Sequence, residues 1–92
     1  MQELLIEGDE VVKIAKALSS KTRWRIITLL RDKKKTDISR IAEALKQTEA
    51  NISAQIKILE KAGIVKTHYE PGEHGVRKIC ELQLDRIVIK LR

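Results

Sequence analysis

The stretch TEANISAQIKILEKA occupies residues 48–62, is followed directly by Gly63, and decides how the rest of the chain is interpreted. Its apolar residues recur at the i, i+4, i+7 spacing of one helical face, at Ile52, Ile56 and Leu59. Thr48 can cap the first turn, and Gly63 supplies the left-handed residue that commonly ends a helix. The stretch therefore predicts an amphipathic helix.

The other faces of this helix are polar, with Glu49, Asn51, Ser53, Gln55 and Lys57 along them. A core helix can have such a pattern. Short amide and hydroxyl side chains near the N-terminus are also what a helix needs to read base edges in a major groove. The helix alone leaves both interpretations open, and the neighbouring segments decide between them.

Composition predicts a small basic domain. A chain of 92 residues that is 42% hydrophobic makes one domain, residues 1–92, with a single core and no room for an enclosed catalytic cleft. Nineteen Lys and Arg against 13 Asp and Glu give a net charge of +6, which favours a polyanionic partner. The single cysteine excludes an internal disulfide, and neither a membrane-spanning run nor a signal peptide is recognisable. We therefore expect a cytoplasmic protein without a membrane partner.

Three helices are predicted before the opening stretch, over about 10–18, 20–31 and 37–45. Residues that favour N-cap positions stand at their starts, namely Asp9, Ser20 and Asp37. Lys46 and Gln47 leave only a tight turn between the third helix and Thr48. Two helices joined by such a turn, the second polar on its outer face, form a helix-turn-helix.

Beyond Gly63 the apolar period changes from 3.6 to 2, which predicts a β-hairpin over 64–84. Pro71-Gly72 marks its tight turn, with Gly72 expected at positive φ, and Gly75 closes the loop. Residues 85–92 favour an extended strand over a helix, and Leu4 to Ile6 are expected to pack on another element. The fold class is mainly α with a β-hairpin wing.

Candidate reactive residues give no catalytic or metal site. His68, His74 and Cys80 lie on the predicted hairpin at a spacing that matches no closed zinc motif. Cys80 alternates with Val76 and Leu82, which suggests a buried thiol. Because no nucleophile, base and oxyanion donors converge, we expect neither an enzyme nor a cofactor.

A basic run precedes the helix pair. Residues 21–35 hold seven Lys and Arg against one acid, Asp32, and end in Lys33-Lys34-Lys35. Taken alone, three lysines are more often a solvated loop than a contact. Their place before the helix-turn-helix predicts phosphate contacts beside the groove that the fourth helix enters.

Three segments in this order, ALSSKTRWRIITLL (17–30), DISRIAEAL (37–45) and TEANISAQIKILEKAGIV (48–65), resemble the ArsR family of winged helix-turn-helix transcriptional repressors. The resemblance runs from about Val11 to Leu82. It implies a homodimer that binds a palindromic operator in double-stranded DNA.

Carried over by position, the family's base-contacting region corresponds to Glu49, Ala50, Asn51, Ser53, Ala54 and Gln55. Lys57 would lie nearer a phosphate, and Arg77 and Lys78 in the wing would reach the neighbouring backbone or the minor groove. Asn51 and Gln55 could each pair with adenine through two hydrogen bonds. Glu49 either accepts from cytosine or stabilises the helix end, and we favour the latter because a negative charge suits a helix N-terminus.

Departures from the family pattern concern two turns and the sensing site. Lys21 stands where the family often has proline, and Lys46 where it often has glycine. Segment 37–45 holds no cysteine or histidine, and 85–92 holds one acid, so a family-style metal sensor is not predicted. The leading hypothesis is a sequence-specific homodimeric repressor. The alternative is a winged-helix protein-interaction module in a transcription or nucleoprotein complex.

Overall fold

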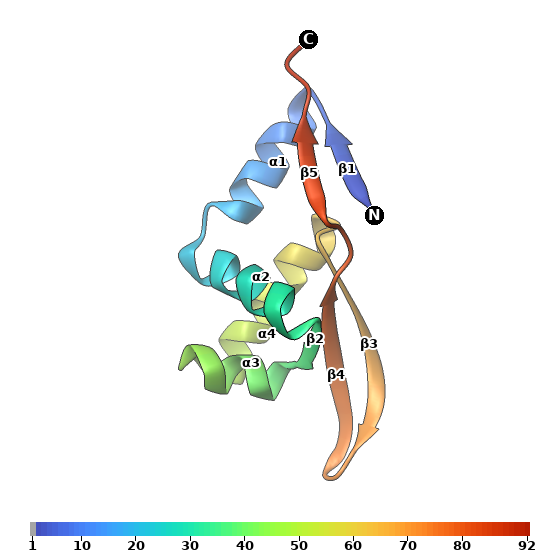
Figure 1. Cartoon of the computed structure of the whole chain (residues 1–92). Coiled ribbons are helices and arrows are strands. Elements are labelled where there is room, and N and C mark those ends of the chain that lie inside the picture. The colour runs from blue at the N-terminus through green and yellow to red at the C-terminus, as the bar shows by residue number, and fades with distance from the viewer. Residues whose placement is uncertain (1) are drawn as a thin grey trace.

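The computed structural model describes residues 2–92 and arranges four helices and five strands along an elongated molecule (Figure 1). The elements in chain order are β1 (Glu3–Ile6), α1 (Asp9–Leu18), α2 (Lys21–Lys33), β2 (Lys35–Asp37), α3 (Ile38–Leu45), α4 (Glu49–Lys61), β3 (Val65–Gly72), β4 (Gly75–Leu82) and β5 (Arg86–Ile89). The predicted class, mainly α with a β-hairpin wing, is confirmed.

Side-chain caps set the starts of three helices, as predicted. Ser20, Asp37 and Thr48 each accept a hydrogen bond from the backbone N–H three residues further on. The prediction for Asp9 is wrong, because Asp9 is the first residue of α1 and Gly8, at φ 63°, holds the N-cap position without a side-chain bond. Asp9 instead places a carboxylate in the first turn, where the helix dipole favours it.

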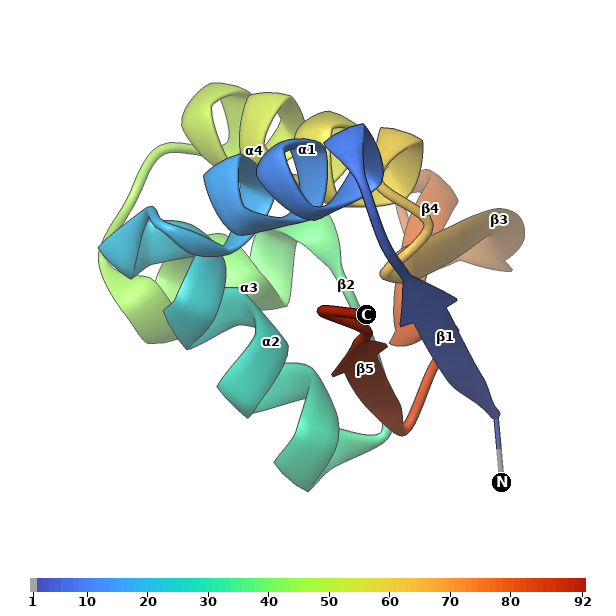
Figure 2. The same cartoon turned by 90° about the horizontal axis from the view of Figure 1, so that it is seen from above.

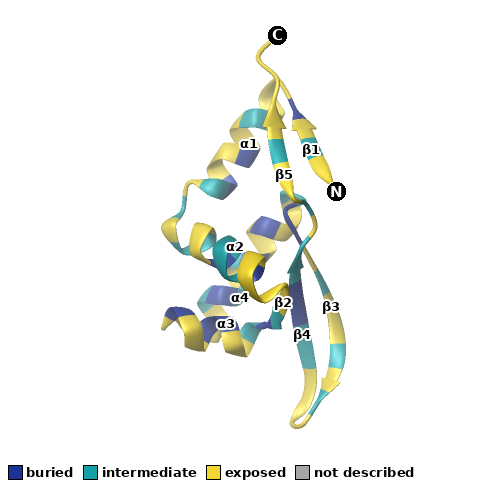
Figure 3. Ribbon diagram, in the orientation of Figure 1, coloured by how far each residue is buried: buried dark blue, intermediate teal, exposed yellow. Residues whose placement is uncertain are grey.

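One face of α4 lies at the centre of the hydrophobic core. Its predicted apolar residues Ile52, Ile56 and Leu59 are all 0% exposed. They pack in one cluster with residues of α2, α3 and the β3–β4 hairpin, including Ile26, Leu30, Ile41, Val65 and Cys80 (Figure 3). This cluster packs one face of α4 against α2, α3 and the β3–β4 hairpin, so that only the other faces of α4 reach solvent.

A short strand that the sequence did not predict joins the hairpin. The second helix was predicted to end at about residue 31, but α2 continues to Lys33, and Lys35–Asp37 then pairs antiparallel with β4 in a sheet of order β2-β4-β3. A three-residue strand shows no alternation of its own. Cross-strand pairing, rather than local propensity, forms it.

The hairpin turn lies two residues later than predicted. The register places Gly72 opposite Gly75, so Glu73 and His74 form the loop. The residue with positive φ is Gly75, at 114°, and the prediction of Gly72 for this conformation is wrong. Pro71 is tolerated within β3 because β3 is an edge strand.

Two short strands near the ends of the chain form a separate parallel pair. Residues 86–89 are extended, as predicted, and pair with β1 in the register Leu4 with Ile87 and Leu5 with Val88. Ile6 is 1% exposed, which confirms that this segment packs, while Met1 lies outside the described residues. Figure 1 shows this pair at the end of the molecule opposite the tip of the wing.

Two residues with left-handed backbone conformations lie in the turn of the helix-turn-helix and directly after it. Gly63 has φ 79°, as expected for the residue after α4, and Lys46 has φ 57° in the turn after α3. A side chain at such a position costs about 1–2 kcal/mol, which explains why glycine is commoner there.

None of the helices in residues 2–92 is long and apolar enough to cross a membrane.

Candidate nucleic-acid interface

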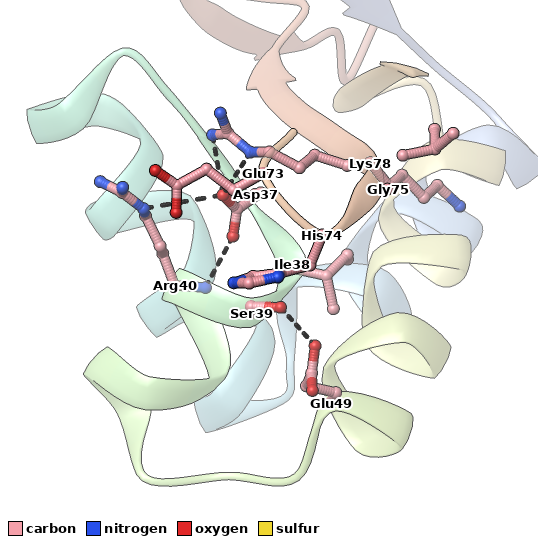
Figure 4. A pocket seen from close by; sticks show the side chains of 11 residues that line it. Asp37, Ile38, Ser39, Arg40, Glu49, Glu73, His74, Gly75 and Lys78 are labelled. Atoms are coloured by element: carbon pink, nitrogen blue, oxygen red, sulfur yellow. Dashed lines mark hydrogen bonds and ion pairs between the residues drawn. The ribbon is translucent and has the colours of Figure 1, made fainter. Parts of the chain in front are cut away.

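Two contacts fix α3 and α4 as a helix-turn-helix. The cap at Thr48 orients the first turn of α4, and Ser39 Oγ of α3 donates to Glu49 Oε1 of α4. Figure 4 shows this bond joining the first turns of the two helices. Glu49 therefore ties α4 to α3, a contact that the sequence did not reveal.

A row of amide side chains runs along one face of α4. Gln55 Nε2 donates to Asn51 Oδ1 at 3.2 Å, and Asn51 Nδ2 donates to Gln47 Oε1 at 2.8 Å. Arg23 of α2 donates to Gln55 Oε1 at 2.6 Å and closes the row at its other end. The structure thus brings together two predicted base-contacting residues, Asn51 and Gln55, and adds two neighbours that the sequence had not singled out.

The other predicted residues of α4 lie on its outer surface. Ser53 is half-buried, and the exposed members of the set are Glu49, Ala50, Ala54 and Lys57. Two small alanines among them allow close approach of a flat surface to the helix backbone. The exposed side of α4 is therefore low in profile at its N-terminal half and positively charged at Lys57.

A cleft of about 610 Å³ separates the first turns of α3 and α4 from the tip of the wing (Figure 4). Asp37 anchors its wall and is only 6% exposed. Its Oδ1 accepts from the Arg40 backbone N–H at 2.8 Å, and its Oδ2 accepts from Arg77 at 3.0 Å through Nε and 2.8 Å through Nη2. One carboxylate therefore connects β2, α3 and the wing.

The two predicted wing cations lie on opposite faces of the hairpin. Directly paired residues of an antiparallel hairpin share a face, and neighbours along a strand alternate. Lys78 pairs with Tyr69, on the same face as Thr67, whose hydroxyl donates to Glu60 of α4. Lys78 is therefore on the α4 side of the wing, whereas Arg77 faces the other way and is bound to Asp37.

Two exposed apolar residues lie beside Lys78 on this face of the wing. Tyr69 is 68% exposed and Val76 is 72% exposed. The sequence grouped Val76 with Cys80 on a buried face; both residues do share a face, but Val76 lies beyond the core near the turn. The alternation correctly predicted which residues share a face of the hairpin, but it does not predict how far along that face the core extends.

The lysine run lies away from α4. The C-terminal end of α2, where Lys33 lies, and α4 are on opposite sides of the helical layer in Figure 2. Lys35 Nζ lies 3.7 Å from Glu70 Oε2 on the wing. The structure does not bring Lys33, Lys34 and Lys35 together with the predicted residues of α4.

The hairpin residues considered for metal binding have other neighbours. Cys80 is 0% exposed, and its burial raises the pKa of the thiol to about 11. His68 Nε2 lies 2.6 Å from Glu70 Oε2, and this contact is the main cause that lowers the pKa of Glu70. Within residues 2–92 no three His, Cys, Asp or Glu side chains come together as potential metal ligands.

The arrangement matches proteins of known family. Residues 20–67 match the family described as bacterial regulatory protein, arsR family. An uncharacterised HTH-type transcriptional regulator of Methanocaldococcus jannaschii, MJ1325, is 36% identical over 62 residues, which cover 67% of this chain and 70% of that protein.

Solved structures show the same architecture. HlyU from Vibrio cholerae superposes with a TM-score of 0.71 at 20% identity, over 83% of this chain and 77% of that one, and shares the fold. A transcriptional regulator homologue from Pyrococcus horikoshii gives 0.67 at 27% identity, over 82% and 76%. The homodimeric winged helix-turn-helix DNA-binding domain Mb0332 from Mycobacterium bovis gives 0.70 at 25% identity, over 82% and 65%. The helix-turn-helix, its wing and these matches together identify the chain as a transcriptional regulator, not an enzyme, that belongs to the arsR family of winged helix-turn-helix proteins.

Proposed function

We propose that this chain is a sequence-specific regulator of transcription that binds double-stranded DNA as a homodimer and acts as a repressor in the cytoplasm. Residues 1–92 form one DNA-binding domain. Helix α4 enters the major groove of a palindromic operator, and the wing contacts the flanking backbone or the minor groove.

The observation that carries this proposal is the amide row that runs from Gln47, in the turn before α4, through Asn51 to Gln55 on α4. Each amide has two N–H donors and an oxygen with two lone pairs, so the bonds within the row leave each of Asn51 and Gln55 with a further donor and a further acceptor. One donor and one acceptor side by side are what adenine requires in the major groove. The row can therefore read bases without breaking its internal bonds.

The remaining α4 residues have complementary roles in this proposal. Ser53 contacts a base or a phosphate, and Lys57 contacts a phosphate one turn further along. Ala50 and Ala54 allow the helix to approach the groove closely and offer apolar contact to a thymine methyl group. Glu49, held by Ser39, stabilises the helix end more than it reads a base.

The wing supplies positive charge close to the proposed DNA, and the lysine run supplies it from farther away. Lys78 is on the α4 side of the wing and reaches the backbone or minor groove, while Arg77 acts from the opposite face of the wing, where it is bound to Asp37. Lys33, Lys34 and Lys35 lie across the helical layer, so their attraction for DNA acts over a longer path that salt screens more strongly.

The proposed dimer joins two copies through α1, β1 and β5. Parallel sheets are normally covered on both faces, yet the outer face of the β1–β5 pair leaves Leu5 59% and Val88 37% exposed. A second copy would cover this face and place two α4 helices about one DNA turn, ~34 Å, apart. The similar Mycobacterium bovis domain is homodimeric, which supports a homodimer for this chain.

Selection of bound fragments from random duplex DNA tests the proposal. We expect enrichment of a palindrome whose half-site centres lie about one helical turn apart. Binding of the enriched fragment should weaken steeply with salt, with a slope near −0.9 for each phosphate contact.

Failure of the selection has a specific meaning. No enrichment from a well-covered library, or binding to every fragment with equal affinity, would contradict sequence-specific reading. In that case the winged-helix protein-interaction module becomes the better explanation of the fold.

A further inference from the structure

Arg23, near the start of α2, bridges two other helices. Its Nε donates to Ala17 O at 2.7 Å and its Nη2 donates to Lys16 O at 3.0 Å. Both carbonyls lie in the last turn of α1, where carbonyl oxygens lack the usual N–H partner four residues further on. Lys16 O also accepts from the backbone N–H and the hydroxyl of Ser19. Arg23 Nη1 donates to Gln55 Oε1 at 2.6 Å. One guanidinium therefore links the end of α1 to α4.

This bridge fixes the direction of the amide row. An arginine offers donors only, so the oxygen of Gln55 must face Arg23 and its NH₂ group must face Asn51. Asn51 accepts that bond through its oxygen and so turns its own NH₂ group toward Gln47. The orientation of each amide follows from the one before it, beginning at Arg23.

The orientation of an amide decides which base it fits. Adenine presents the N7 acceptor and the N6 donor at fixed positions, so the N–H and the oxygen of a bidentate amide must each lie on the correct side. A carboxamide turned by half a rotation has almost the same shape but the reverse hydrogen-bonding pattern. Whatever holds the amides of Asn51 and Gln55 in one orientation therefore contributes to specificity without touching DNA.

We propose that Arg23 is a positioning residue that sets the sequence specificity of α4 by fixing the amide orientations of Gln55 and Asn51. The inference rests on the proposed role of α4 in reading DNA. It differs from the expectation for the basic run as a whole, in which Arg23 would contact a phosphate. Three of its five N–H donors already point at protein oxygens.

The test compares Arg23→Lys with Arg25→Lys in the full chain. Lysine keeps the positive charge but lacks the planar fork that reaches two carbonyls and an amide together. Arg25, exposed on the same helix, is the matched control. The probes are the duplex that the wild-type protein enriches, single-base-pair variants of it, and a random duplex.

We expect Arg23→Lys to reduce discrimination against substituted A·T pairs by about tenfold, as for the loss of one bidentate contact. Affinity for the random duplex and the salt slope should stay at the wild-type value. Arg25→Lys should keep full discrimination.

Three results would overturn the inference. The first is full discrimination by Arg23→Lys. The second is a uniform loss of affinity for all duplexes with a salt slope lowered by about one, which marks a phosphate contact. The third is a lower melting temperature with intact discrimination, which marks a purely structural role.

A second measurement needs neither a variant nor DNA. In nitrogen-15 spectra of the wild-type protein, slow rotation of a guanidinium held by three bonds should give separate Nη signals for Arg23, while Arg25 gives one averaged signal. An averaged signal for Arg23 would refute the bridge. If the wild-type protein enriches no duplex, the proposed DNA reading fails, and this spectrum still tests the bridge on its own.

Discussion

Arg77 Nη2 lies 2.8 Å from Asp37 Oδ2, and this ion pair fastens the wing to the first turn of α3. The side chain of Asp37 is 9% exposed and that of Arg77 is 41% exposed, so the carboxylate is desolvated while the guanidinium is half in solvent. The same carboxylate caps α3 through the Arg40 backbone N–H. One acid therefore caps α3 and binds the wing at the same time.

Asp37→Ala should lower the free energy of unfolding by roughly 2–4 kcal/mol, because it removes an N-cap and a largely buried ion pair together. Urea denaturation measures the change. Arg86→Ala is the matched control, since it breaks an exposed pair with Glu3 and should cost less than about 1 kcal/mol. Equal losses for the two variants would show that burial of Asp37 contributes nothing.

Ile52→Ala should destabilise the fold by about 2–5 kcal/mol, because Ile52 is 0% exposed at the centre of the core and truncation leaves a cavity. The loss should appear in thermal melting before any test of DNA binding. Ile58→Ala on the same helix, at a site 40% exposed, should cost less than half as much. A smaller loss for Ile52 than for Ile58 would contradict the assignment of the core face.

Local patterns were sufficient for the helical part of the fold. The caps at Ser20, Asp37 and Thr48 and the apolar face of α4 follow from periodicity and capping chemistry, which act within one turn of helix. Strand β2 and the parallel β1–β5 pair form only because they pair with segments far along the chain, and a local sequence pattern cannot predict such pairing. The turn was misplaced because Pro71-Gly72 is a strong turn signal, yet the pairing of β3 and β4 continues past it.

The sequence predicted which residues of α4 form the candidate site, but not every hydrogen bond that joins them to their neighbours. Helical spacing already placed Asn51 and Gln55 on neighbouring turns. The bond from Asn51 to Gln47 joins residues four apart and is local. The bond from Arg23 to Gln55 requires the packing of α2 beside α4, which no spacing within the segment encodes. The phosphate contacts of Lys33, Lys34 and Lys35 stay a prediction; the C-terminal end of α2, where Lys33 lies, is on the side of the helical layer opposite α4.

Cys80 should resist alkylation in the folded protein. Its burial raises the pKa of the thiol to about 11, so at pH 8 roughly one molecule in a thousand carries the reactive thiolate, against about a quarter for an exposed thiol. Reaction with iodoacetamide, followed by mass spectrometry, should be slow in buffer and fast in guanidinium chloride. Because the folded pKa is raised, this group stabilises the fold below about pH 8.5, and the contribution disappears as pH rises through about 11. Rapid native labelling at pH 8 would contradict the buried environment.

Leu5→Glu should convert the proposed dimer to a monomer in analytical ultracentrifugation. The substitution places a charge on the outer face of the β1–β5 pair, beside Val88, where a second copy would bury it at high cost. Val76→Glu introduces the same charge at a comparably exposed apolar site on the wing and should leave the assembly unchanged. A dimer that survived Leu5→Glu would place the seam elsewhere, and a monomeric wild-type chain would refute the assembly.

Salt dependence can separate the cations that touch phosphates from those that only attract DNA. Each phosphate contact contributes about −0.9 to the slope of log K against log salt. Substitution of Lys57 on α4 or of Lys78 on the α4 side of the wing by glutamine should lower the magnitude of the slope by about one.

Joint substitution of Lys33, Lys34 and Lys35 by glutamine should lower the magnitude of the slope by clearly less than one per lysine, because charges farther than a Debye length of ~10 Å from the phosphates are screened. A loss of about one for each of these three lysines would instead show that DNA bends around the helical layer to meet them, and no loss for Lys57 and Lys78 would refute the placement of α4 and the wing against the duplex.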